Sequence, residues 1–171
     1  MGAHEQGADA TAGHWLTIPR TLCFVQNSDD LLLMKRAPHR RVFPNQYNGL
    51  GGHIERDEDP FSAAMREIKE ESGLDVYDMR LRAVHNISTD AVTGIMLFVF
   101  TAWADRREFI SDDVEGTLHW VPIAALSEYD LVEDLPLMLP RILQMAPDAA
   151  PLFGLVTYDE MDKIQIQYVH S

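Results

Sequence analysis

The sequence has a single cysteine, Cys23, and few basic side chains. One thiol excludes an internal disulfide and is typical of a reducing compartment, and its place in an apolar run predicts a core residue. The 14 Lys and Arg residues against 27 Asp and Glu residues give a formal charge of −13, which repels polyanions. We therefore expect no binding to nucleic-acid polymers, whereas a small phosphorylated ligand is still compatible because a bound cation reverses the local charge.

The chain also lacks a hydrophobic run of membrane-spanning length, and its start lacks the basic and apolar regions of a signal peptide. Residues 1–15 show no periodicity, and we expect them to form a flexible tail. Residues 16–171 are enough for one domain and too few for two. We expect a cytoplasmic protein without membrane partners, and monomer and homodimer are both open.

Apolar stretches and turn residues predict an α/β architecture. Strands are expected at residues 21–26, 31–34, 75–86, 95–104 and 118–121, with a final hairpin at 151–158 and 163–169. Short helices are expected at 123–126 and 135–145. A central helix is expected from Asp59 and Pro60, an acidic N-cap followed by proline, to a stop at Gly73. This order predicts a mixed sheet between helices.

The side chains of the central helix fall into two stripes. The first should pack against the sheet and contains Phe61, Ala64, Met65 and Ile68. The second contains Glu67, Glu70 and Glu71, which repel one another and on composition alone are most simply a solvated face. Hard oxygen ligands on a rigid helix, just after the glycine-rich turn 49–52, instead favour Mg²⁺ or Mn²⁺.

One spaced motif contains both the turn and the helix. Gly52 is followed after five residues by Glu58, and after seven more by the run Arg66-Glu-Ile-Lys-Glu-Glu-Ser-Gly-Leu74. Glu58 is placed to pair with Arg66 and hold the loop on the helix. This pattern resembles the Nudix box, and the order of elements around it resembles the α/β/α sandwich of the Nudix hydrolases.

The resemblance implies a loop–helix–loop that binds one to three divalent cations, and hydrolysis of a diphosphate linkage by a water activated there. By matching position, the expected catalytic residues are Arg66, Glu67, Glu70 and Glu71, the expected cation ligands are Gly51, Glu67, Glu70, Glu71 and Glu115, and the expected loop-orienting residues are Gly52 and Glu58. Arg66 orients a glutamate through its planar fork. The resemblance leaves open which glutamate is the general base.

Residues outside the box resemble the MutT-like branch, which converts oxidised purine nucleoside triphosphates to monophosphate and pyrophosphate. Asn48 matches a base-contacting asparagine, with a plain turn residue as the equal alternative. Asp134 matches an aspartate that reads the oxidised base, although an acid near a helix N-terminus is at least as good a reading. Val132 and Leu135 depart from the pattern of some relatives, so base recognition should differ in detail.

The basic residues ahead of the glycine turn form one cluster, made of Lys35, Arg36, Arg40 and Arg41. Lys35 and Arg36 end a predicted strand and are the expected substrate-binding residues of this cluster, able to steer a triphosphate into an acidic molecule. Arg40 and Arg41 are more simply solvated loop charges. Two other functions stay open: hydrolysis of ADP-ribose, a nucleotide sugar or another nucleoside diphosphate derivative, and a non-catalytic nucleotide sensor.

Overall fold

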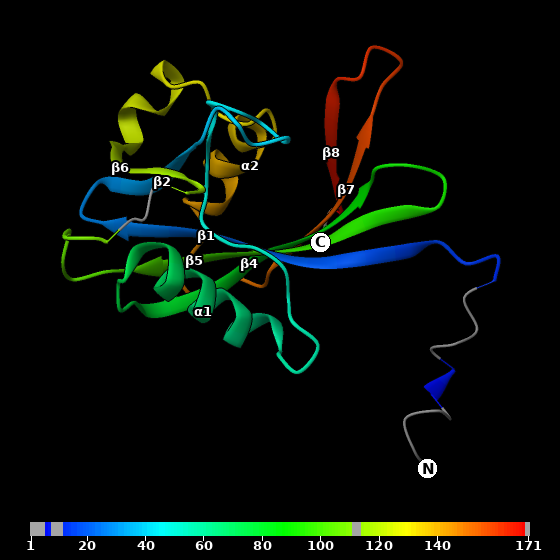
Figure 1. Cartoon of the computed structure of the whole chain (residues 1–171), viewed down its shortest axis with the longest axis horizontal. Helices are drawn as coiled ribbons and strands as arrows, with labels where there is room; N and C mark the ends of the chain where they lie inside the picture. The colour runs from blue at the N-terminus through cyan, green and yellow to red at the C-terminus, as the bar shows by residue number, and fades with distance from the viewer. Residues whose placement is uncertain (1–5, 8–11, 111–113, 170–171) are drawn as a thin grey trace.

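The computed structural model describes residues 6–7, 12–110 and 114–169, and within these ranges eight strands form one mixed sheet (Figure 1). The strands are β1 (Leu16–Asn27), β2 (Asp30–Arg36), β3 (Tyr47–Asn48), β4 (Tyr77–Ser88), β5 (Thr93–Trp103), β6 (Gly116–Pro122), β7 (Leu152–Tyr158) and β8 (Ile164–Tyr168). The helices are α1 (Pro60–Ser72), the 3₁₀ helix η2 (Ile123–Glu128) and α2 (Leu135–Ile142). The sheet order is β3-β2-β1-β5-β4-β7-β8, with β6 paired to β2.

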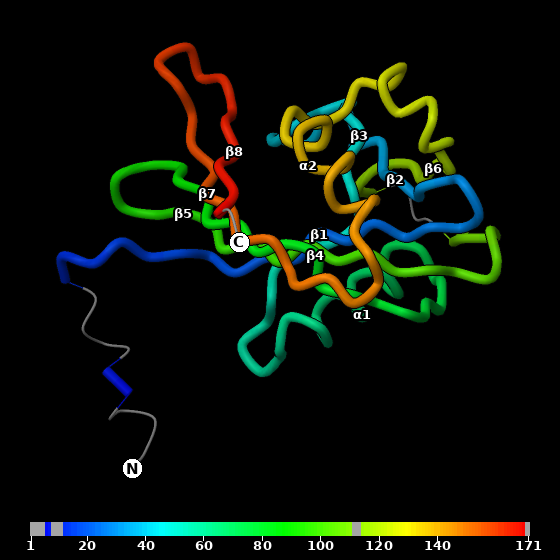
Figure 2. The backbone as a smooth tube through the Cα atoms, turned by 180° about the vertical axis from the view of Figure 1, so that it is seen from behind, coloured from blue at the N-terminus to red at the C-terminus, as the bar shows by residue number. Residues whose placement is uncertain are grey.

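Strand β1 is central to this sheet. Its end pairs antiparallel with β2, and it runs parallel to β5 from the Leu16–Thr93 pair to the Gln26–Trp103 pair. Beyond β5, the strand β4 is antiparallel and β7 lies parallel to β4, with β8 closing a hairpin. Figures 1 and 2 show α1 on one side of the sheet and α2 on the other, which confirms the expected mixed sheet between helices.

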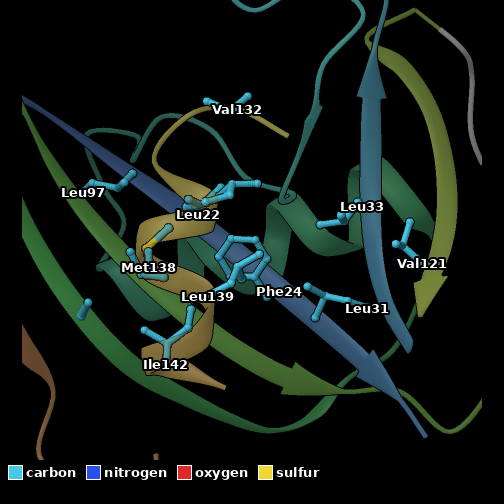
Figure 3. Close-up of a cluster of buried hydrophobic side chains, with 13 residues drawn as sticks. Leu22, Phe24, Leu31, Leu33, Leu97, Val121, Val132, Met138, Leu139 and Ile142 are labelled. Carbon is cyan, nitrogen blue, oxygen red and sulfur yellow. The ribbon is translucent and has the colours of Figure 1, made fainter. Parts of the chain in front are cut away.

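Alternation along β1 divides the buried side chains between two cores. Leu22 and Phe24 belong to the cluster that contains Met138 of α2, as Figure 3 shows. Cys23 and Val25 point to the other face and pack with the residues of α1. Cys23 is a free, fully buried thiol, which confirms the predicted core position.

Both predicted ends of α1 are confirmed. The Asp59 carboxylate accepts hydrogen bonds from the amides of Phe61 and Ser62 at 2.8 and 3.0 Å. Gly73 ends the helix in the left-handed region, with φ of 69°, and its amide donates to the Lys69 carbonyl. A residue with a Cβ is strained in this conformation, so glycine is the favoured stop.

The predicted apolar stripe of α1 is only partly right. Ala64 and Ile68 are fully buried, but Phe61 and Met65 are 49% and 36% exposed. Ala63 is buried in their place. The helix is thus turned towards its small side chains, which lets it approach the sheet more closely than a face with Phe and Met would allow.

Several boundaries also differ from the sequence prediction. β1 begins at Leu16, five residues earlier than expected, and the irregular stretch before the glycine turn contains the short strand β3. Trp15, in the predicted tail, donates to the Asp90 carbonyl at 3.1 Å, and residues 1–5 and 8–11 lie outside the described residues. Across the described ranges, no helix is long and apolar enough to cross a membrane.

Candidate active site

A cavity of about 640 Å³ lies between the glycine turn, the loop after β2 and the α2-facing side of the sheet. We call the part beside Glu67, Glu71 and Glu115 its carboxylate end, and the part beside Asn48 and Asp134 its base end. The apolar part of the lining is formed by Leu22, Ile87, Ile95, Leu97 and Val132. A cavity that combines an apolar lining with a few convergent polar groups is the usual form of a small-molecule site.

The glycine turn is held against β1 by backbone hydrogen bonds. The Thr21 amide donates to the Gly52 carbonyl at 2.9 Å, and Leu50 and Cys23 exchange two bonds of 3.0 and 2.7 Å. Gly51 has φ of 129°, and a Cβ there would meet the Thr21 carbonyl oxygen. A Cβ on Gly52 would lie 2.6 Å from Oε1 of Glu67. The turn therefore needs glycine at both positions. At Gly51 a side chain would meet the Thr21 backbone, and at Gly52 it would displace the Glu67 carboxylate.

Glu71 is the most deeply placed carboxylate of α1. Its Oε2 accepts a 2.9 Å hydrogen bond from the Gly51 amide, which fixes the turn to the helix. Burial, together with the negative charges of Glu67 and Glu115, raises the pKa of Glu71 to about 8, against the lowering effect of the Gly51 hydrogen bond. Bringing these carboxylates together is costly without a compensating positive charge.

Arg66 binds both flanks of the carboxylate end. Its Nε and Nη2 donate to the two oxygens of Glu58 at 2.6 and 3.0 Å, and Nη1 donates to Glu67 and Glu70, each at 3.0 Å. Nη2 also donates to the His53 carbonyl at 3.1 Å. The hydrogen bonds that Arg66 donates to Glu58 are the main cause that raises the pKa of Arg66, and they also lower the pKa of Glu58. The pair expected from the sequence is thus present, and it orients Glu67 and the loop together.

The donor set fits a divalent cation. Burial and the charges of Glu70 and Glu115 raise the pKa of Glu67, while Arg66 lowers it. In the part of the chain that is described, no three His, Cys, Asp or Glu side chains are grouped so that they could hold a metal ion by themselves. Mg²⁺ and Mn²⁺ typically bind one or a few carboxylates and complete their shell with water and substrate phosphates. Mutually repelling carboxylate oxygens at an open cavity suit that mode of binding.

The basic residues at the end of β2 and in the loop after it lie in different directions. Arg40 approaches Glu115, with Nη1 3.5 Å from Oε1, and Nε of Arg36 donates to the Val42 carbonyl at 2.8 Å. Both arginines line the cavity, and burial followed by the like charge of Arg40 lowers the pKa of Arg36. Lys35 does not line it and instead lies with Nζ 5.8 Å from the Tyr47 ring centroid. Successive strand residues point to opposite faces, so Lys35 and Arg36 diverge.

The base end contains both polar residues expected from the sequence. Asn48 lines the cavity, and its Oδ1 accepts a 2.9 Å bond from the Gly49 amide, so it also acts as a turn residue. Asp134 lines the cavity with a buried Oδ1 that has no hydrogen-bond partner. Burial raises the pKa of Asp134 to about 6. A buried oxygen without a partner in the protein is a natural acceptor or donor site for a ligand.

Sequence reasoning missed two charged residues of the cavity, Arg20 and Glu55, and Arg20 is the one that lies on a strand. The predicted strand began at residue 21, so Arg20 was not assigned to a face. With β1 starting at Leu16, the alternation places Arg20 on the same face as Leu22 and Phe24. A prediction that β1 starts at Leu16 would have assigned Arg20 to the cavity face.

Comparisons with known proteins agree with this geometry. The family model described as the NUDIX domain matches residues 16–142. The nucleoside triphosphatase NudI of Enterobacter sp. (strain 638) is 30% identical over 120 residues, which cover 64% of this chain and 84% of that protein. A 46-residue match to the m7GpppN-mRNA hydrolase NUDT17 of Danio rerio is 48% identical but spans 27% of this chain and 15% of that protein. The crystal structure of the mutator MutT protein from Bacillus halodurans has a TM-score of 0.73 at 21% identity, covering 88% of this chain and 97% of that one.

Proposed function

The chain belongs to the Nudix family and is a hydrolase of nucleotide diphosphate compounds, and we propose that it converts a nucleoside triphosphate to monophosphate and pyrophosphate, with an oxidised purine such as 8-oxo-dGTP preferred. The observation that carries this proposal is that one cavity has both a carboxylate end and a base end. One nucleotide can occupy both ends at once. The relative NudI, a nucleoside triphosphatase, supports the triphosphate class.

A divalent cation, Mg²⁺ or Mn²⁺, belongs to this proposal. Glu67, Glu71 and Glu115 would hold it, together with Glu70 and the Gly51 carbonyl. When bound, the cation lowers the pKa of water and neutralises charge on the leaving phosphate. Glu70 is the most exposed helix carboxylate of the set, with 60% of its side chain accessible, so it needs Arg66 to keep it in place.

The protein's own groups perform the positioning. Arg66 keeps Glu67 turned towards the cavity, and the Gly51 amide keeps Glu71 in one orientation. Oriented carboxylates hold a reactant in near-attack geometry, which contributes much of the rate enhancement in such sites. Arg36, near the carboxylates and lining the cavity, is a donor for the phosphate chain.

Base recognition is proposed at Asn48 and Asp134. The Oδ1 atom of Asn48 accepts from the Gly49 amide, and its NH₂ group can donate to the base. The Asp134 carboxyl has a pKa of about 6, so near neutrality it accepts, and in mild acid it also donates. An oxidised purine edge, which differs from the unoxidised one in its donors and acceptors, can be distinguished by such a pair.

A substrate panel tests this proposal: 8-oxo-dGTP, dGTP, dATP, ADP-ribose and a nucleotide sugar, with millimolar Mg²⁺ and identification of the products. We expect kcat/KM for 8-oxo-dGTP to exceed that for dGTP by about 100-fold, equivalent to about 2.7 kcal/mol at the transition state, with pyrophosphate released. Faster turnover of ADP-ribose or the sugar would refute the triphosphate proposal. Tight nucleotide binding without any product would instead indicate a sensor.

Cellular location and assembly stay within the same proposal. The buried free thiol of Cys23 supports a reducing compartment such as the cytoplasm. Monomer and homodimer both leave the cavity complete, because every residue named for the reaction comes from one chain.

A further inference from the structure

Arg20 is a cavity residue whose side chain has no partner. Its Nε is buried and forms no hydrogen bond, and across the described ranges no ion pair or hydrogen bond reaches its guanidinium. Arginine in a protein is always charged, and a partly buried guanidinium without an acceptor is costly. A ligand that enters the cavity can supply the missing acceptor.

Three other arginines beside the carboxylates already have a partner within the protein. Arg66 donates to Glu58, Glu67 and Glu70. Arg40 faces Glu115, and Arg36 donates to the Val42 carbonyl. Arg20 and Arg40 both act as like charges on Arg36, so the free guanidinium lies within electrostatic range of the others. Of the cavity arginines, Arg20 and Arg41 make no side-chain hydrogen bond or ion pair within the described ranges, and of these two only Arg20 has a buried nitrogen without a partner.

The register of β1 places Arg20 at a defined point along the cavity. The glycine turn runs antiparallel beside β1, with Gly49 against Phe24 and His53 opposite Arg20. Gly51 and Gly52 lie between these two points, beside Thr21. At about 3.3 Å per residue, Arg20 is about 13 Å from Phe24 along the strand.

Asn48, which directly precedes Gly49, lies on the Phe24 side of this axis. The Val132 amide donates to the Tyr47 carbonyl at 2.9 Å, which brings the segment before Asp134 to the strand that contains Asn48. Asn48, the carboxylates beside Gly51 and Gly52, and Arg20 thus follow one another along β1. A nucleotide with its base at Asn48 and its first phosphate at the carboxylates extends its remaining phosphates towards Arg20.

We propose that Arg20 binds the terminal phosphates of the substrate, the part that leaves as pyrophosphate, and so selects triphosphates over diphosphates of the same nucleoside; this inference rests on the proposed function. The guanidinium fork matches two phosphate oxygens. A nucleoside diphosphate, one phosphate shorter, reaches Arg20 less well. Arg20 acts here in binding and specificity and takes no part in proton transfer.

The test compares the wild type with Arg20→Gln and Arg20→Lys, and with Arg106→Gln as a matched control, since Arg106 is an exposed arginine that donates to the Gly73 carbonyl. Affinity for inorganic pyrophosphate with Mg²⁺ is measured by calorimetry, and kcat/KM is measured for the triphosphate and diphosphate of one nucleoside. Circular dichroism checks the fold. We expect Arg20→Gln to weaken pyrophosphate binding about 10-fold or more and to lower the triphosphate-to-diphosphate ratio of kcat/KM by a similar factor. Both quantities should be intermediate for Arg20→Lys, between those of the wild type and of Arg20→Gln. Arg106→Gln should match the wild type in both.

The outcomes separate the two levels of the argument. If the wild type hydrolyses triphosphates but Arg20→Gln keeps its pyrophosphate affinity and its substrate ratio, the role of Arg20 is refuted and the proposed function stands. If the wild type hydrolyses no triphosphate, the proposed function fails and the inference fails with it. Should Arg20→Gln not fold, Arg20→Lys carries the test, since it keeps the charge and loses the fork.

Discussion

At the carboxylate end of the cavity the helix carboxylates are tied in place, with Arg66 bound to Glu58, Glu67 and Glu70 and the Gly51 amide bound to Glu71. At the base end the side chains are less constrained, and Oδ1 of Asp134 has no partner at all. Groups that must act on any substrate are prearranged by the protein. Groups that distinguish one substrate from another find their hydrogen-bond partner only in the ligand. A wrong substrate leaves such a buried group unpaired, which weakens its binding.

Glu71→Gln should have the largest effect, because it removes a charge from the centre of the prearranged end. We expect kcat to fall about 1000-fold or more with the fold intact. Added Mg²⁺ should raise the thermal midpoint of the wild type and leave that of the variant unchanged. Enzyme assays and thermal shift measure both effects.

Glu160→Gln is the control for this substitution, since Glu160 is exposed in the turn of the C-terminal hairpin. It should behave as the wild type in both measurements. Wild-type turnover by Glu71→Gln would refute the assignment of the carboxylate end as the reaction centre.

Two alanine substitutions in the glycine turn should separate its two roles. Gly52→Ala places a Cβ 2.6 Å from the Glu67 carboxylate, which can swing aside, so we expect little change in stability. The displaced Glu67 should lower kcat by about 100-fold. Gly51→Ala meets the Thr21 backbone and has φ of 129°, so it should cost about 2 to 4 kcal/mol of unfolding free energy.

Chemical denaturation and kinetics on both variants check this contrast. If Gly52→Ala keeps full activity, the orientation of Glu67 does not matter for turnover. If Gly51→Ala is as stable as the wild type, the backbone of the turn is not under the constraint described.

The sequence predicted the carboxylate end well because one local segment contains most of it. Helical spacing alone aligns Glu67, Glu70 and Glu71, and the caps at Asp59 and Gly73 define the helix on either side. The Glu58–Arg66 pair spans eight residues, a separation that a loop and two helical turns close without any long-range contact.

The rest of the cavity depends on strand starts and faces, which the sequence defines poorly. Arg20 was missed because the start of β1 lies five residues earlier than its apolar pattern indicates. Lys35 was grouped with Arg36, although a shift of one residue in a strand moves a side chain to the opposite face. The rotation of α1 about its axis, which exposes Phe61, depends on packing against strands that are distant in the sequence. No local pattern shows this packing.

Lys35→Gln and Arg36→Gln test that difference in face directly. Each substitution removes one positive charge, and the two positions are neighbours in β2. Arg36 lines the cavity, so its loss should lower kcat/KM by about 30-fold, mainly through KM. Lys35 lies outside the cavity over Tyr47, so its loss should change kcat/KM by less than about twofold. Equal losses would mean that the cluster acts through its general field and not through contact.

Asp134→Asn should have the smallest effect, and it appears in stability. The folded protein raises the pKa of Asp134 from 3.8 to about 6 through burial, so the unfolded chain releases this proton at lower pH. Above pH 6 the charged Asp134 carboxylate therefore destabilises the folded state. Below pH 4 this destabilisation is absent, because the carboxyl is protonated in both states. Asparagine never ionises, so the variant should be more stable than the wild type above pH 7, by about 1 to 2 kcal/mol after allowance for partial exposure.

This gain should shrink as the pH falls through 6 and vanish near pH 4, as followed by urea denaturation at each pH. His85, whose pKa burial lowers to about 4, destabilises both proteins in acid, and its effect cancels in the difference. Asp148→Asn, at an exposed site after α2, is the control for removing a carboxylate that does not line the cavity. A constant difference between Asp134→Asn and the wild type from pH 4 to 8 would mean that folding does not raise the pKa of Asp134, so that burial does not destabilise its carboxylate. The base end would then be as prearranged as the carboxylate end, and the contrast between them would be lost.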